Sequence, residues 1–354
     1  MPIDWRFMVC IGSAKYIHAS QEAIIRGVKE GKSPPTVRIE FFKPAAITIG
    51  CYQNVDEEVN VREAKKRGLD IMRRLTSGGA ILQSQDAAAW DIYIPDRWPD
   101  LPPVIEDSFE YLSKPAIEFF RMMGIDARFR LKNDIEVGGK KISGVAQHRE
   151  DGVVFHSGTL LLDFDVPLMM RVLKLPIEKL DGKAIKSFEE RITTVKREKG
   201  FKPSFEKVVD TFKKAVGKVF NVKLEDGELN EFEKSVFAET LKKYKSKKWV
   251  YGLRSCKGYE ATHIVKTPAG LIRIHGKISS NILENLLITG DFFIYPQRAI
   301  YDLEAYLKWT RVEEVNNKVK DFFEERKAKI IGLSPMDLAS ILEKALTRKN
   351  NRTF

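Results

Sequence analysis

Cysteine is scarce in this sequence. The 354 residues contain three, Cys10, Cys51 and Cys256, which lie far apart and include no Cys-x-x-Cys pair. An odd and scattered set of this kind encodes neither a disulfide framework nor a zinc cluster of the usual spacing. The sequence therefore predicts buried thiols rather than cross-links.

Long apolar stretches are also missing. No run approaches the 18 or more apolar residues of a membrane-spanning helix, and the start, Met-Pro-Ile-Asp-Trp-Arg, has charged residues where a secretory signal needs an apolar segment. We therefore expect a cytoplasmic protein without membrane contact. Apolar residues still make up 43% of the chain, which excludes disorder as the main state, and the length predicts two domains.

Several catalytic signatures are absent as well. The five histidines form no His-x-x-x-His pair, the glycines form neither a Walker loop nor a Gly-x-Gly-x-x-Gly motif, and no Gly-x-Ser-x-Gly elbow occurs. We therefore predict neither a metal held by protein ligands nor a serine hydrolase. The net charge of +11 fits nucleic acid, a membrane surface or an acidic protein partner, although most surface lysines and arginines are simply solvated.

Strand-like and helix-like segments alternate along the chain. Apolar patterns predict strands at 6–11, 36–42 and 46–50 and helices at 19–29 and 57–66, and Ser204 is expected to cap a later helix. This order predicts an α+β (α/β) fold, a mixed sheet flanked by helices. A change from polar to aromatic residues near position 250 divides the chain into a domain of residues 1–250 and a smaller C-terminal α+β domain of residues 251–354.

The segment 73–82 fits an anion-binding loop. An apolar strand there leads Arg73 and Arg74 into the small residues Ser77-Gly78-Gly79-Ala80. Glycine has no Cβ, so backbone N–H groups of such a loop can approach a phosphate or carboxylate, and an arginine beside it can bind the same anion through two hydrogen bonds. The alternative is an ordinary turn with surface arginines.

A second segment, 132–147, places a lysine among small residues. Gly138-Gly139 predicts a hairpin turn, and counting the alternation from Ile142 puts Lys141 and Ser143 on one face of the following strand. A lysine in this setting can reach into a cleft and stabilise negative charge during acyl or nucleotidyl transfer. The alternative is a solvent-exposed side chain.

Taken in order, these segments resemble the lipoate–protein ligase A family of the biotin/lipoate ligase superfamily. The residues that carry the resemblance are Ala46-Ile47-Thr48-Ile49-Gly50, Gln53-Asn54, Glu57-Glu58-Val59-Asn60, Gly68, Arg73-Arg74, Gly78-Gly79-Ala80, Asn133-Asp134, Gly139-Lys140-Lys141-Ile142-Ser143-Gly144 and Gly158-Thr159-Leu160-Leu161. Beyond residue 250, Lys257-Gly258-Tyr259, Gly270-Leu271-Ile272 and Gly290-Asp291-Phe292-Phe293 resemble the accessory domain of these ligases. The resemblance covers nearly the whole chain and implies a biotin/lipoate ligase-like sheet with a fused C-terminal accessory domain.

The resemblance implies a two-step reaction. Lipoate or octanoate reacts with ATP, which brings Mg²⁺, to give an acyl-adenylate, and the acyl group then passes to a lysine of a lipoyl-acceptor domain. Acceptors of the 2-oxoacid dehydrogenase E2 type or the glycine-cleavage H-protein type are implied, and a basic surface suits acidic domains of this kind. A monomer without nucleic acid as partner is expected.

The resemblance also assigns roles to residues. Lys141 matches the family's essential lysine and is the catalytic candidate. The nucleotide is expected to contact Arg74, Gly78, Gly79, Ala80, Ile81, Leu82, Asn133, Asp134 and Lys141. The acyl substrate is expected to contact Arg74, Lys141, Ser143, Gly144, Ala146 and Gly158, with Leu75, Ile81 and Val145 along its apolar tail.

The sequence departs from the family pattern at a few positions. Ser77 replaces a glycine, Gln83-Ser84 replaces His-Asp, and Ser157 replaces a histidine for which the preceding His156 is a candidate substitute. These changes bear on acyl specificity and on phosphate contacts.

Three other functions are weighed. An octanoyl or lipoyl transferase on the same scaffold often uses a cysteine before the lysine hairpin, and residues 107–147 contain none. A biotin ligase would need a glycine-arginine loop that is missing here. A basic nucleic-acid-binding protein without catalysis is the alternative from a different class.

Overall fold

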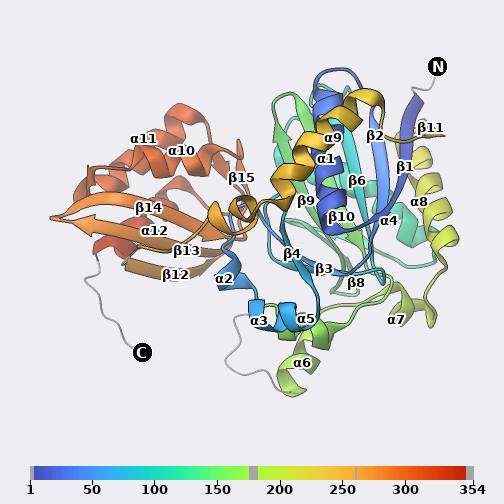
Figure 1. The fold of residues 1–354 in the computed structure, drawn as a ribbon, viewed down its shortest axis with the longest axis horizontal. Helices are drawn as coiled ribbons and strands as arrows, with labels where there is room; N and C mark the ends of the chain where they lie inside the picture. The colour runs from blue at the N-terminus through green and yellow to red at the C-terminus, as the bar shows by residue number, and fades with distance from the viewer. Residues whose placement is uncertain (1–3, 175–181, 260, 348–354) are drawn as a thin grey trace.

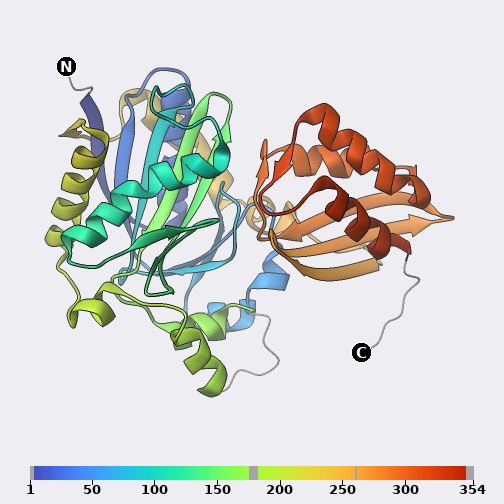
Figure 2. The ribbon, with the colours of Figure 1, turned by 180° about the vertical axis from the view of Figure 1, so that it is seen from behind.

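The structure, a computed structural model, describes residues 4–174, 182–259 and 261–347. Two bodies lie side by side, one built around a large sheet and the other around a smaller C-terminal sheet (Figures 1 and 2). No helix in the described residues is long and apolar enough to cross a membrane.

The large sheet is mixed. Its strands follow the order β11-β1-β2-β6-β10-β9-β8-β7, in which β1 runs parallel to β11 and β2 and the remaining neighbours are antiparallel. The bounds in chain order are β1 (Asp4–Gly12), β2 (Thr36–Phe42), β6 (Ala88–Pro95), β7 (Arg128–Arg130), β8 (Asp134–Val137), β9 (Lys140–Glu150), β10 (Val153–Leu160) and β11 (Lys223–Asp226). This sheet confirms the predicted fold class.

Helices cover both faces of the large sheet (Figures 1 and 2). On one face lie α1 (Ala14–Lys29) and α9 (Glu231–Lys245), and on the other lie α4 (Ile105–Met122) and α8 (Phe205–Phe220). The predicted cap of α8 is confirmed, because the Ser204 hydroxyl accepts a hydrogen bond from the Lys207 N–H. Burial of Val208, Phe212 and Val216 on one side of α8 then fixes the helix against the sheet.

A small sheet lies beside the large one, and two of its strands are joined by the loop of residues 74–80 that begins with Arg74. It consists of β3 (Ala46–Ile49), β4 (Asp70–Arg73) and β5 (Ile81–Gln83), with β3 in the centre. The predicted single helix at 57–66 is wrong. The structure has α2 (Val55–Glu58) and α3 (Val61–Lys66), because Val59 is extended and bridges to Leu173 while Asn60 caps α3.

The C-terminal sheet runs in the order β12-β13-β14-β16 and packs against helices. Its strands are β12 (Ala261–Thr267), β13 (Gly270–Ser279), β14 (Ile282–Gly290) and β16 (Thr310–Arg311), and the helices are α10 (Ala299–Tyr306), α11 (Val315–Arg326) and α12 (Pro335–Thr347). The remaining elements are α5 (Val166–Val172), α6 (Gly182–Glu189), α7 (Val195–Lys199), η1 (Lys248–Gly252), β15 (Ile294–Tyr295), η2 (Val312–Glu314) and β17 (Lys329–Ile330).

The two bodies exchange side chains where they meet. Tyr52 is buried in the core of the C-terminal body, while Phe293 and Tyr295 are buried in the core of the large sheet. The Tyr52 hydroxyl donates to the Gln297 carbonyl at 2.6 Å, and the Tyr295 hydroxyl donates to the Gln147 carbonyl at 2.9 Å. The division into domains at residue 250 stays a prediction. The contact between the two bodies includes buried aromatic side chains and hydrogen bonds from both of them.

Candidate active site

A cavity of about 160 Å³ lies between β9, β10 and the loop that joins β4 to β5. Most of the predicted site residues line it: Arg74, Gly78, Gly79, Ala80, Ile81, Asn133, Lys141, Gly144, Val145, Ala146 and Gly158. The fold therefore brings the segments 73–82 and 132–147 together around one cavity.

Four predicted residues are not among those that line this cavity. Leu75 and Leu82 pack into the hydrophobic core beside the small sheet. Asp134 contacts the Lys141 side chain, and Ser143 is fully buried. The predicted contacts of these four residues with nucleotide or acyl substrate stay predictions, and the side chains that line the cavity are those of their neighbours.

A bulge in β9 explains the position of Ser143. Ile135 pairs with Ser143 and Glu136 pairs with Lys141, which leaves Ile142 as an extra residue in the strand. The prediction that Lys141 and Ser143 share a face is wrong, because the extra residue reverses the alternation between them. The backbone of Lys141 is held on its other side by hydrogen bonds with Arg191 and Thr193.

Lys141 forms the charged, accessible wall of the cavity. Its Nζ lies 2.6 Å from Asp134 Oδ1, and 38% of its side chain is exposed. Asp134 also receives a hydrogen bond from Arg130 at 2.8 Å. Gly144 makes room for the lysine, since a Cβ at this position would lie 2.7 Å from Nζ.

Arg74 forms a buried part of the cavity wall. Its guanidinium donates to the carbonyl oxygens of Thr48, Ser77 and Gly79 and to the Thr76 hydroxyl, at 2.7–3.1 Å. Burial lowers the pKa of Arg74 to about 10, so the group stays charged at neutral pH. These contacts fix the glycine loop around Arg74, and the predicted contact of Arg74 with a phosphate stays a prediction.

Glycine is required at two positions of the cavity wall. A Cβ on Gly158 would lie 2.5 Å from the Trp90 ring, which packs beneath β10. Gly78 has φ +95°, a conformation that favours glycine. A Cβ on Gly78 would also lie 3.3 Å from the Phe293 ring. The C-terminal body therefore supplies an aromatic side chain, Phe293, to this cavity.

A buried polar group at the cavity wall escaped the sequence analysis. His18, Gln21 and Glu40 line the cavity, and they connect to Arg38 and Asp91 behind them. The Arg38 guanidinium lies 2.6 Å from Glu40 and 3.0 Å from Asp91. The sequence did contain a sign of this group. Arg38 and Glu40 are two residues apart in the otherwise apolar strand 36–42, so their side chains lie on the same face of that strand.

Burial changes the protonation of this group. It raises the pKa of Glu40 well above its usual range, and the nearby Asp91 raises it further. Burial lowers the pKa of His18 to about 4, so the imidazole is neutral at pH 7. The His18 ring shares a hydrogen bond with Gln21 through Nδ1 at 2.6 Å, and Nε2 has no hydrogen-bond partner within the described part of the chain.

Three of the four positions that depart from the family pattern also line the cavity, and Ser84 is not among the lining residues. Ser77, Gln83 and Ser157 line the cavity, and so do several residues that the sequence analysis did not select: Phe42, Thr76, Ala89, Phe155 and Thr159. His156 does not replace the missing histidine. Its ring is fully buried between Trp90 and Phe109, because alternation along β10 turns it away from the face of Ser157.

The three cysteines do not contribute to the cavity wall. Cys10, Cys51 and Cys256 all lie in the described residues, and none of them lines the cavity. Burial raises the pKa of Cys10 to about 11 and also raises that of Cys51. Neither of these buried thiols has the lowered pKa of a reactive cysteine.

The chain is similar to known proteins in sequence and in fold. A family model described as the lipoyl protein ligase A/B catalytic domain matches residues 13–217. The octanoyltransferase LipM of Brevibacillus brevis is 28% identical over 271 residues, which cover 70% of this chain and 98% of that protein.

Two solved structures extend the comparison. A bi-partite lipoate protein ligase of Thermoplasma acidophilum, studied with its E2 lipoyl domain, is 26% identical, has a TM-score of 0.64 and covers 71% of this chain and 97% of its own. LipL1 of P. falciparum in complex with lipoate is 16% identical, has a TM-score of 0.75 and covers 97% of this chain and 100% of its own, so its fold includes the C-terminal body. The chain belongs to the lipoyl protein ligase A/B catalytic domain family, whose members carry out lipoyl or octanoyl transfer.

Proposed function

We propose that the protein is an ATP-dependent lipoate–protein ligase. It would activate lipoate or octanoate as an acyl-adenylate and transfer the acyl group to a lysine of a lipoyl-acceptor domain. The observation that carries the proposal is Lys141, an accessible ammonium group at a cavity that a glycine loop also lines. Acyl transfer is common to the family, and the proposal adds that ATP supplies the energy for it.

The first step would join the acyl carboxylate to the nucleotide. A carboxylate oxygen attacks the α-phosphorus of ATP, the bond to the β-phosphate oxygen breaks, and pyrophosphate leaves. Lys141 can offset the negative charge that gathers on the α-phosphate during this attack. In the structure Lys141 is paired with Asp134, so nucleotide binding would exchange this contact for one with phosphate.

The residues present fit a nucleotide with its metal ion. Gly78 and Gly79 leave the backbone of the loop open, and Arg74 keeps a positive charge behind them. Asn133 lines the cavity and Asp134 lies 2.6 Å from Lys141 Nζ, and Mg²⁺ prefers oxygen ligands of this kind together with phosphate oxygens. The apolar tail would lie along Ile81, Val145 and Phe293.

The second step would use the acceptor's own nucleophile. The ε-amine of the acceptor lysine attacks the carbonyl carbon of the acyl-adenylate, an amide forms, and AMP leaves with the bonding electrons. No enzyme nucleophile is required. The net charge of +11 favours an acidic acceptor domain, and the E2 lipoyl domain studied with the Thermoplasma acidophilum ligase is an acceptor of the proposed kind.

A second candidate is an octanoyltransferase that needs no ATP. The name of the Brevibacillus brevis relative favours it, since that protein is called an octanoyltransferase and matches over nearly its whole length. A transferase with a covalent enzyme intermediate needs a nucleophile at the cavity, and the lining offers hydroxyl groups such as Thr76, Ser77 and Ser157 but no thiol. This composition is the reason why we place the ligase first.

One experiment separates the two functions. The purified chain is incubated with an acceptor domain in two reactions, one with lipoate or octanoate, ATP and Mg²⁺, the other with an octanoylated carrier domain and no nucleotide. Intact mass of the acceptor and release of pyrophosphate are measured in both. A mass gain with pyrophosphate in the first reaction alone supports the ligase, whereas a mass gain in the second alone replaces it by the transferase.

A further inference from the structure

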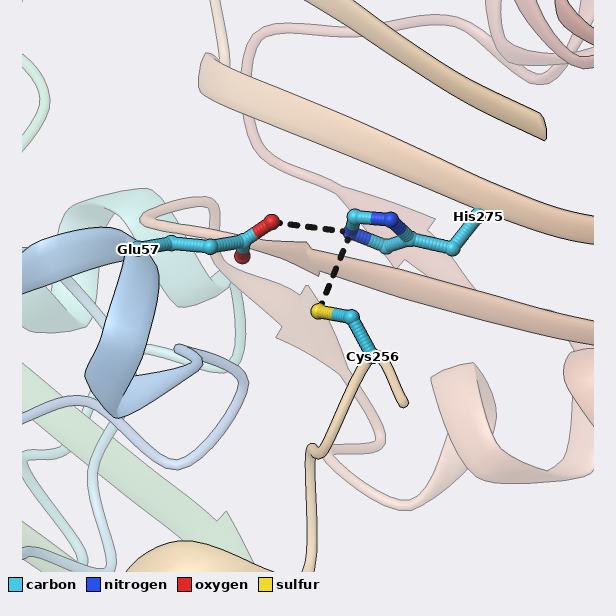
Figure 3. Close-up of side chains that lie close together, drawn as sticks. All are labelled: Glu57, Cys256 and His275. Atoms are coloured by element: carbon cyan, nitrogen blue, oxygen red, sulfur yellow. Dashed lines mark hydrogen bonds and ion pairs between the residues drawn. The ribbon is translucent and has the colours of Figure 1, made fainter. Parts of the chain in front are cut away.

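Three side chains with metal-binding atoms meet outside the cavity, where the two bodies touch. Glu57 comes from α2, Cys256 from the segment after η1, and His275 from β13 (Figure 3). His275 Nε2 lies 3.0 Å from Glu57 Oε1 and 3.6 Å from Cys256 Sγ, and the ligand atoms of all three residues lie within 4.8 Å of one another. Glu57 and Cys256 both approach the same ring nitrogen of His275.

The spacing fits one tetrahedral ion. Zn²⁺ binds imidazole nitrogen at about 2.0–2.1 Å and thiolate sulfur at about 2.3 Å, which places the two donor atoms about 3.6 Å apart in a tetrahedron. The observed separation between His275 Nε2 and Cys256 Sγ is 3.6 Å. Glu57 would need to move slightly outward, and its side chain is partly exposed.

Neighbouring hydroxyl groups orient two of the three ligands. The Thr262 hydroxyl lies 3.2 Å from His275 Nδ1. When a metal ion takes the place of the hydrogen that Nε2 shares with Glu57, Nδ1–H can donate to Thr262 and the Nε2 lone pair is free to bind the metal. The Thr289 hydroxyl donates to Glu57 Oε2 at 2.8 Å and leaves Oε1 toward His275. Such outer partners are typical of metal-binding histidines and carboxylates.

The charges around the cluster also fit a divalent cation. The two nearby arginines are already paired, Arg273 with Glu58 and Arg254 with Glu304. His275 is almost fully buried, with 3% of its side chain exposed. A thiolate and a carboxylate together offset the two positive charges of one metal ion, so a loaded cluster would be neutral beside the buried His275.

We propose that Glu57, Cys256 and His275 form a binding site for a Zn²⁺-class ion that joins the two bodies. The thiolate and the imidazole favour zinc over Mg²⁺ or Ca²⁺, and three protein ligands leave a fourth position for water. Loading would release the thiol proton to solvent as the sulfur–metal bond forms. The ligands lie at positions 57, 256 and 275, so no short spacing motif marks them, and the sequence-based prediction that the protein holds no metal is one that this proposal replaces.

The test uses the full chain, stripped of metal with a chelator and reduced. Co²⁺ is titrated into it while absorbance is recorded, and Zn²⁺ is then added in competition. We expect one Co²⁺ per chain, with a thiolate-to-cobalt charge-transfer band and tetrahedral visible bands that zinc removes. Zinc should also raise the melting temperature of the chain. No charge-transfer band at one equivalent of Co²⁺ would overturn the proposal.

Variants assign the ligands. Cys256→Ser should remove the charge-transfer band and weaken zinc binding by at least about 100-fold, while Thr262→Val should weaken it about 10–100-fold with the band kept. Cys10→Ala is the thiol control and should bind as the wild type does. If Cys256→Ser fails to fold, His275→Gln and Thr262→Val decide instead, and unchanged zinc affinity in both contradicts the site.

Discussion

The two walls of the cavity hold their positive charges in different ways. Arg74 is buried and uses its guanidinium to bond loop carbonyls and the Thr76 hydroxyl. Lys141 is accessible and has one ion pair, to Asp134, among the contacts described. A charged group that is held by several buried hydrogen bonds keeps the loop in place. A charged group with a single ion pair can give up that partner and bind a substrate instead. This difference is our reason for proposing a chemical role for Lys141 and a structural role in the loop for Arg74.

The largest effect is expected from Lys141→Ala. Loss of one charged donor to a developing anion costs about 10²–10³-fold in rate, so adenylate formation, measured by pyrophosphate release, should fall by this factor. The melting temperature should stay close to that of the wild type, because Lys141 is partly exposed. Lys140→Ala, at the exposed start of β9, is the matched control. Near-normal pyrophosphate release from Lys141→Ala would remove the lysine from the mechanism.

Arg74→Met should mainly cost stability. The change leaves buried carbonyl oxygens without their donor, and we expect a loss of about 3 kcal/mol in the free energy of unfolding, read from urea denaturation. Arg128→Met is the control, because Arg128 pairs at the surface with Asp126. A folded Arg74→Met variant with full stability and no ATP binding would break the comparison and make Arg74 a phosphate ligand.

Gly144→Ala should displace the lysine without unfolding the chain. The new Cβ would meet Nζ at 2.7 Å and Cε at 2.9 Å, and the end of a lysine side chain can move. A misplacement of this size should lower the rate of adenylate formation about tenfold or more. Gly217→Ala in α8 is the control, since its Cβ meets only a carbonyl oxygen at 3.4 Å. Equal rates for both variants would show that the position of Lys141 is not critical.

The smallest effect concerns two buried histidines. Burial lowers the pKa of His18 from 6.5 to about 4 and that of His156 from 6.5 to about 3. Below pH 6.5 the unfolded chain binds protons that the folded chain excludes, so stability falls with pH until the folded-state values are reached. At pH 5.5 each histidine should cost about 1.4 kcal/mol relative to pH 8. Urea midpoints at both pH values measure this.

His156→Gln isolates one of the two contributions. This variant should lose less stability than the wild type between pH 8 and pH 5.5, and His18→Gln should behave in the same way. An identical pH dependence in all three proteins would mean that neither ring is kept neutral by burial.

The sequence predicted much of the site and less of its geometry. The order of strands and helices, the two arginines and the lysine hairpin were visible, because each depends on neighbouring residues. The bulge at Ile142 could not be predicted. An extra residue in one strand can be recognised only when the pairing with the neighbouring strand is known. The helix at 57–66 splits because Val59 bridges to Leu173, which is far along the chain.

Contacts between distant segments account for the other omissions. His18, Gln21 and Glu40 meet at the cavity only once α1 packs on the sheet beside β2 and β6. The cluster of Glu57, Cys256 and His275 needs three segments from both bodies. Periodic patterns describe neighbouring residues only, so they could not predict contacts between segments that lie far apart in the sequence.

Phe293 carries a consequence for how the protein behaves on dilution. This residue lies on the C-terminal body and still lines the cavity beside Gly78. Because both bodies belong to one chain, the ring is presented at an effective concentration fixed by the fold rather than by the amount of protein present. The catalytic rate per molecule should therefore be independent of protein concentration, whereas an enzyme assembled from two separate chains would lose activity as its parts dissociate.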